Sequence, residues 1–126
     1  MVILCCLNLS WYLQLSLIYY LFMNEEIQRI IDTIVNSVPV EKLYLFGSHV
    51  NGIPNENSDY DFYIVVPNED IRPIDAIGNA HLAMRGMKVK PVDILAGTVE
   101  IFNRRSKQLT IEGKIAREGL ILYERG

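Results

Sequence analysis

An Asp-x-Asp pair at the start of an apolar run constrains this chain more than any other feature. Residues 43–66 read LYLFGSHVNGIPNENSDYDFYIVV. A short apolar run ends at Gly47-Ser48, ten residues follow, and Asp59 and Asp61 then open a second apolar run. Residues two apart on a strand project from one face, so two such carboxylates repel each other unless a cation binds there. The stretch therefore predicts two strands that meet at a cation site.

Length and composition limit the classes of function. The chain has 126 residues, which corresponds to one domain, and half of them are hydrophobic. Its formal net charge is -3 and it has no basic block, so we expect no stable binding of nucleic acid. The two cysteines, Cys5 and Cys6, are adjacent and have no zinc-site spacing, which fits a reducing cytoplasm.

The first 22 residues differ from the rest because they carry no charge. Their length approaches the ~20 apolar residues of a membrane-spanning helix, but no basic residue precedes them and no signal cleavage site follows. Met23 begins MNEEIQRIIDTIV, which has the character of a natural start. We therefore expect residues 1–22 to be an extension and residues 23–126 to be the domain. A membrane anchor and an extra core helix are the alternatives.

Helical and strand patterns alternate from residue 24 onward. The spacing of apolar residues, the capping residues and the turn signals predict helices over 24–38, 70 or 73 to 87, 98–106 and 109–117, and strands over 43–46, 59–66, 89–95 and 120–123. This order indicates an α/β fold with a mixed β-sheet and helices packed mainly on one face.

A third carboxylate, Asp93, lies in the middle of the apolar run 89–95. A carboxylate inside a buried strand needs a partner or a function. If this strand lies beside strand 59–66, then Asp93 joins Asp59 and Asp61 on one face. Three carboxylates suit a two-metal magnesium site for phosphoryl-type transfer, in which Asp93 is also a candidate base for the attacking hydroxyl.

Gly47 and Ser48 provide the anion-binding side of this prediction. A glycine allows a phosphate to approach the backbone, and a serine at the start of a helix donates to phosphate oxygens. The stretch is not a P-loop, since no Gly-Lys-Ser/Thr follows. Each piece has a simpler explanation, as a turn, a solvated strand end or a satisfied structural carboxylate. The specificity therefore lies in their combination and order.

The pattern LFGS, SDYDFYIVV and VDIL resembles the minimal nucleotidyltransferases of the DNA polymerase β-like superfamily, from about residue 23 to the end. The resemblance implies the nucleotidyltransferase fold, a triphosphate bound at Gly47 and Ser48, and metal held by Asp59, Asp61 and Asp93. The spacing is similar to that of the antitoxin class. It implies a type VII antitoxin that transfers AMP from ATP to a tyrosine of a HEPN-domain toxin.

The chain departs from that family at two positions. Many relatives have Gly-Ser-Arg-x-Arg-Gly, whereas His49 and Asn51 stand here in place of the arginines. Neither is expected to carry a full positive charge at neutral pH. Arg85, Lys88 and Lys90 are candidate substitutes, although a solvated basic edge explains them equally simply. The alternative is therefore a catalytically weak or inactive antitoxin that neutralises its partner by binding alone.

Overall fold

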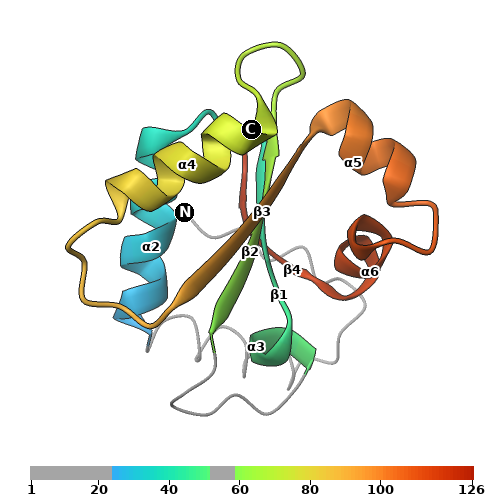
Figure 1. Ribbon diagram of the computed structural model, residues 1–126. Coiled ribbons are helices and arrows are strands. Elements are labelled where there is room, and N and C mark those ends of the chain that lie inside the picture. The colour runs from blue at the N-terminus through green and yellow to red at the C-terminus, as the bar shows by residue number, and fades with distance from the viewer. Residues whose placement is uncertain (1–23, 52–58) are drawn as a thin grey trace.

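The computed structural model describes residues 24–51 and 59–126, and its central feature is a four-stranded sheet with the order β3-β2-β1-β4 (Figure 1). The strands are β1 (Lys42–Phe46), β2 (Tyr60–Val66), β3 (Val92–Thr98) and β4 (Leu120–Glu124). Strand β1 pairs antiparallel with β2 and β4, whereas β2 pairs parallel with β3. The predicted mixed sheet is confirmed, and β3 and β4 are its edges.

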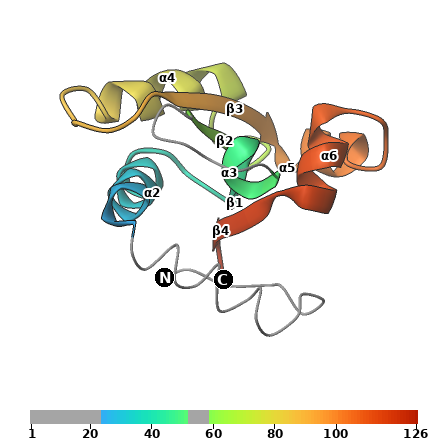
Figure 2. The ribbon, with the colours of Figure 1, turned by 90° about the horizontal axis from the view of Figure 1, so that it is seen from below.

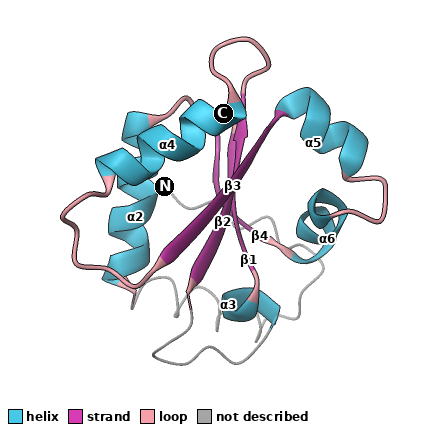
Figure 3. Cartoon of the chain, in the orientation of Figure 1, coloured by secondary structure: helices cyan, strands magenta, loops and turns pink. Residues whose placement is uncertain are grey.

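Helices cover both faces of this sheet, as Figures 1, 2 and 3 show. The two longest described helices, α2 (Glu25–Ser37) and α4 (Pro73–Ala83), lie on one face, where the larger hydrophobic core forms. The shorter helices α5 (Val99–Arg105) and α6 (Ile111–Glu118) lie on the other face over a smaller cluster. The larger core thus lies on one face, as predicted, and a second, thinner layer covers part of the other.

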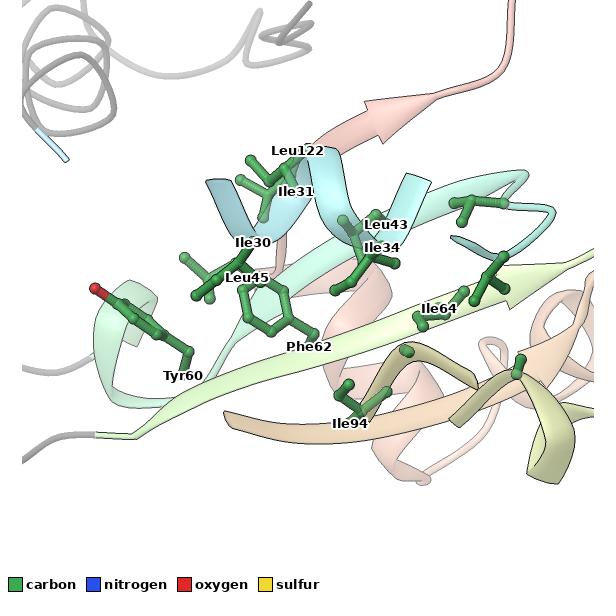
Figure 4. Close-up of a cluster of buried hydrophobic side chains, with 14 of the residues drawn as sticks. Ile30, Ile31, Ile34, Leu43, Leu45, Tyr60, Phe62, Ile64, Ile94 and Leu122 are labelled. Carbon is green, nitrogen blue, oxygen red and sulfur yellow. The ribbon is translucent and has the colours of Figure 1, made fainter. Parts of the chain in front are cut away.

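The larger core follows the alternation of side chains along the strands. Phe62 and Ile64 of β2 point to the same face as Leu43 and Leu45 of β1, and they meet the apolar side of α2 (Figure 4). All four of these side chains are fully buried. Intervening residues of β2 therefore point to the opposite face.

Polar side chains cap the first turns of α2, α5 and α6. The side chain of Asn24 accepts a hydrogen bond from the backbone N–H of Ile27, and the side chain of Thr98 accepts one from Ile101. Thr110 does the same for α6 through the N–H of Gly113. These caps satisfy N–H groups that a helix cannot pair internally.

The structure corrects two local expectations. Strand β3 begins at Val92 instead of residue 89, because its parallel partner β2 begins only at Tyr60, which pairs with Val92. The helical spacing predicts one side of α4 that carries Ile74 and Ala80, but Ile74 is 66% exposed, whereas Ala76 and Ala80 are buried. The apolar residues of α4 itself are distributed around the helix, so their spacing does not determine which side is buried.

The expected extension, residues 1–22, and most of the turn-rich loop, 52–58, lie outside the described residues. Among residues 24–51 and 59–126, no helix is both long and apolar enough to span a membrane.

Candidate active site

The sheet brings the ends of three strands together at one place. Phe46, the last residue of β1, pairs with Asp61 of β2, and Asp61 pairs directly with Asp93 of β3. Gly47 follows Phe46 and therefore lies on the other side of Asp61 from Asp93. The predicted glycine and two of the three predicted carboxylates thus lie side by side across neighbouring strands. Asp59 lies just before β2 and is exposed.

Gly47 is required at its position for two independent reasons. Its backbone φ is +79°, a conformation that side chains with a Cβ rarely adopt. A Cβ built on Gly47 would also clash with Oδ2 of Asp61. The turn between β1 and the short helix α3 (Ser48–Asn51) therefore passes directly against the carboxylate.

The electrostatics of Asp61 are unfavourable without a cation. Burial raises the pKa of the Asp61 carboxyl above its ordinary value, and the neighbouring charges of Asp93 and then Asp59 raise that pKa further. His49 acts in the opposite direction. A carboxylate that is desolvated and faces two like charges is stabilised by a positive partner.

Asp93 differs from the expectation that it lies inside a buried strand. Its side chain is exposed, and β3 is an edge strand of the sheet. Asp93 is therefore accessible to a second reactant from the edge of the sheet.

The carboxylates fit a hard cation in their chemistry. Within the described stretches, no three His, Cys, Asp or Glu side chains stand close enough together to hold a metal ion by themselves. Magnesium, however, commonly takes only one or two carboxylates and completes its shell with water and substrate phosphates. The adjacent Asp61 and Asp93, with the raised pKa of Asp61, form a donor set of this kind.

The residues expected to bind phosphate, Gly47 and Ser48, carry no charged side chain, unlike the aspartates expected to bind metal. Ser48 is exposed and begins α3, a single turn in which the N–H of Val50 donates to the carbonyl of Gly47. His49 is buried, and its ring centroid lies 4.5 Å from that of Tyr60. The imidazole therefore packs toward the core, which the sequence pattern alone did not indicate.

Tyr60, between the two aspartates, anchors the opposite face. Its ring also lies beneath Lys90, whose Nζ is 5.7 Å from the ring centroid, and its hydroxyl accepts a hydrogen bond from Nδ2 of Asn24. The backbone N–H of Lys90 donates to Glu26. Of the three candidate basic residues, Lys90 thus packs against Tyr60, whereas Arg85 and Lys88 are exposed.

A buried polar cluster lies on the carboxylate face, two residues along β2 from Asp61. The Tyr63 hydroxyl donates to Oε2 of Glu112 at 3.4 Å, and Nε of Arg105 forms an ion pair with Oε1 of Glu112 at 2.6 Å. Burial, and then the charge of Glu112, raise the pKa of Tyr63 well above its usual value. The residues are far apart in sequence, so local patterns did not predict this cluster.

Comparisons with known proteins point to one family. The family model described as "Polymerase beta, Nucleotidyltransferase" matches residues 28–126, a range that includes all four strands. A search of curated proteins found no match. The chain is also similar to a solved structure described as "Crystal structure of the toxin-antitoxin with AMP-PNP", with 18% identity and a TM-score of 0.48. That similarity covers 78% of this chain and 73% of the other.

Proposed function

Because the chain belongs to the polymerase β nucleotidyltransferase family, we propose that it is a magnesium-dependent nucleotidyltransferase that moves AMP from ATP to a hydroxyl group of a partner protein. The observation that carries this proposal is the register of the sheet. It sets Asp61 beside Asp93 on neighbouring strands, and Gly47, directly after β1, lies against Asp61. One end of the sheet thus offers a close backbone approach for phosphate beside a pair of carboxylates.

The roles of these residues follow from their order. Gly47 and Ser48 would receive the triphosphate, and Asp59, Asp61 and Asp93 would hold magnesium, which neutralises negative charge on the phosphates. The acceptor's hydroxyl oxygen bonds to the α-phosphorus of ATP while its proton passes to the Asp93 carboxylate. The bond from the α-phosphorus to the bridging oxygen breaks, and pyrophosphate leaves with that electron pair.

We further propose that the acceptor is a HEPN-domain toxin and that the chain acts as a type VII antitoxin in the cytoplasm. The support is the resemblance of the LFGS and SDYDFYIVV segments to the antitoxin class.

Label transfer tests this proposal directly. The chain is incubated with magnesium, ATP labelled at the α-phosphate and a candidate HEPN protein, and the label on the acceptor is counted. We expect transfer by the native chain and at least a hundredfold less by Asp61→Asn. Gly78→Ala is the matched control, since Gly78 lies on α4 with open space around it. An equal, low signal from all three proteins would rule out the enzyme.

A second candidate, neutralisation by contact alone, is favoured by one observation. His49 replaces an arginine of the resemblance, and its ring packs on Tyr60. The phosphate side could then be too weak for turnover. In cells that express the toxin, Asp61→Asn and Asp93→Asn would still protect growth under this candidate, whereas the enzymatic proposal predicts loss of protection.

A further inference from the structure

Strand β3 is one edge of the sheet, and α4 packs against it from one face. It pairs only with β2, and no other described segment bonds to its outer side. Natural edge strands are commonly protected by lysine, proline or a bulge. The seven residues of β3, VDILAGT, contain neither lysine nor proline. At the opposite edge, the ion pairs Lys42–Glu124 and Arg125–Glu41 join β4 to the segment of β1 beside it.

The alternation of backbone hydrogen bonds along β3 shows which of its N–H and C=O groups face away from β2. The N–H of Tyr60 donates to the carbonyl of Pro91, so the residue that pairs with it, Val92, directs its own polar groups away from β2. Alternate residues follow the same phase. The backbone N–H and C=O groups of Val92, Ile94 and Ala96 therefore form an outward row of donors and acceptors.

The side chains between these residues point to the carboxylate face. They are Asp93, Leu95 and Gly97, which pair with Asp61, Tyr63 and Val65. Leu95 is 41% exposed, a large apolar side chain beside the carboxylate assigned to the attacking hydroxyl. Gly97 packs against the Tyr63 hydroxyl, where a Cβ would clash. The edge therefore carries a carboxylate and then an apolar contact, on the side of Asp61 away from Gly47.

We propose that an extended segment of the acceptor protein adds to β3 as a further strand, with its hydroxyl residue opposite Asp93 and an apolar residue two positions away on Leu95. This inference rests on the proposed function, since it names how the acceptor reaches that site. Main-chain bonds to the outward row hold the segment, and alternate side chains reach the carboxylate face. In an antiparallel pairing, the residue opposite Asp93 lies in a non-hydrogen-bonded pair, where side chains are closest.

A defined peptide tests the proposal. The probe is an acetylated and amidated heptapeptide with tyrosine at its centre, valine two residues to either side and threonine elsewhere. With the native chain, we expect the amides of Ile94 and Ala96 to become protected from hydrogen exchange on peptide binding. With ATP and magnesium, AMP should appear on the central tyrosine. Lysine in place of both valines should weaken binding at least fivefold.

Backbone methylation of the peptide gives the sharpest readout. Methyl groups on the amides that face β3 should reduce affinity at least tenfold, and methyl groups on the alternate amides should change it less than twofold. On the protein, Ala96→Pro removes one outward donor, as an edge strand tolerates, and Ala96→Ser is the matched control that keeps it. Only the proline variant should lose peptide binding, while both remain stabilised by magnesium and ATP.

Three results would overturn the proposal. They are peptide binding that ignores the methylation pattern, no protection of the β3 amides by any of the peptides, and protection that rises with protein concentration alone. The last would show that a second copy of the chain occupies the edge. Stabilisation by magnesium and ATP is measured separately. Its absence would count against the proposed function, whereas the exchange data decide the docking of the acceptor.

Discussion

At the scale of single residues, Asp61 is a carboxylate in an unfavourable electrostatic environment. It is partly buried, it pairs with Asp93, and both burial and neighbouring carboxylates raise its pKa. A folded-state pKa above the unfolded value means that the folded chain holds the proton more tightly. The contribution of Asp61 to stability is then present below its unfolded pKa and is lost as the pH rises through the raised folded pKa.

Replacement of Asp61 by asparagine should therefore stabilise the metal-free chain at neutral pH. The amide removes the repulsion but keeps the size of the side chain. We expect the melting temperature of Asp61→Asn to exceed that of the native chain at pH 7, with a smaller difference at acidic pH, where the native Asp61 carboxyl is protonated. Magnesium with ATP should raise the melting temperature of the native chain only. A variant less stable than the native chain at pH 7 would contradict the repulsion.

Gly47 can be tested with two other glycines as internal controls. Gly47→Ala combines a positive φ with a clash against Asp61, and we expect it to destabilise the chain by about 2–4 kcal/mol and to abolish transfer. Gly86→Ala has a similar φ of +84° with open space around it, so it should cost only about 1 kcal/mol. Gly78→Ala lies in a helix and should be stabilising by about 0.5–1 kcal/mol.

Urea unfolding of the three glycine variants measures these free energies. If Gly47→Ala costs no more than Gly86→Ala, then the close approach to Asp61 contributes nothing beyond backbone strain. Activity gives a second reading, since Gly86 and Gly78 are outside the candidate site and their variants should retain transfer.

At the scale of elements, the sequence predicted most helices and strands because local signals define them. Asn24 and Thr98 cap their helices through side-chain oxygens, as their positions indicated. The cap formed by Thr110 was not predicted. The start of β3 and the exposure of Asp93 were missed because they depend on which strand is its neighbour. Strand order is a property of the whole sheet, and the hydrophobic pattern of one segment does not determine it.

The same limit applies to the candidate site. The Asp-x-Asp spacing and the Gly-Ser turn indicated that a glycine and carboxylates meet, and the register confirms that Gly47, Asp61 and Asp93 are neighbours. The burial of His49 against Tyr60 was not predictable, because the loop pattern gave no reason for an imidazole to turn inward.

The cluster that joins α5 and α6 to β2 should affect stability more than chemistry. Arg105→Ala leaves the buried carboxylate of Glu112 with the hydroxyl of Tyr63 as its one side-chain partner among the described residues, so we expect the free energy of unfolding to fall. Arg104→Ala is the control, because Arg104 is an exposed neighbour on the same helix and forms no ion pair within the described residues. Chemical unfolding measures both.

Transfer activity separates this cluster from the site. At a temperature where Arg105→Ala remains folded, its transfer rate at saturating ATP should stay within about threefold of the native rate. Arg105 contacts Glu112 of α6 and does not contact Asp61 or Asp93. A much larger loss would assign the cluster a role in positioning Asp61.

At the scale of the whole molecule, the described core begins after the first 22 residues. The larger cluster runs from Ile27 to Tyr123, and α2 is already capped by Asn24. The family match likewise begins at residue 28. A chain that starts at Met23 therefore contains every described contact that holds the sheet and the candidate site together.

We expect the chain from Met23 to Gly126 to fold cooperatively and to keep the site. Its free energy of unfolding should lie within about 1 kcal/mol of the full chain, because no contact within the described core is removed. Magnesium and ATP should stabilise both chains equally, as measured by thermal unfolding. The two chains should also be compared for partition into membrane vesicles. A collapse of stability in the shorter chain would favour the core-helix alternative, and loss of vesicle binding would favour the anchor.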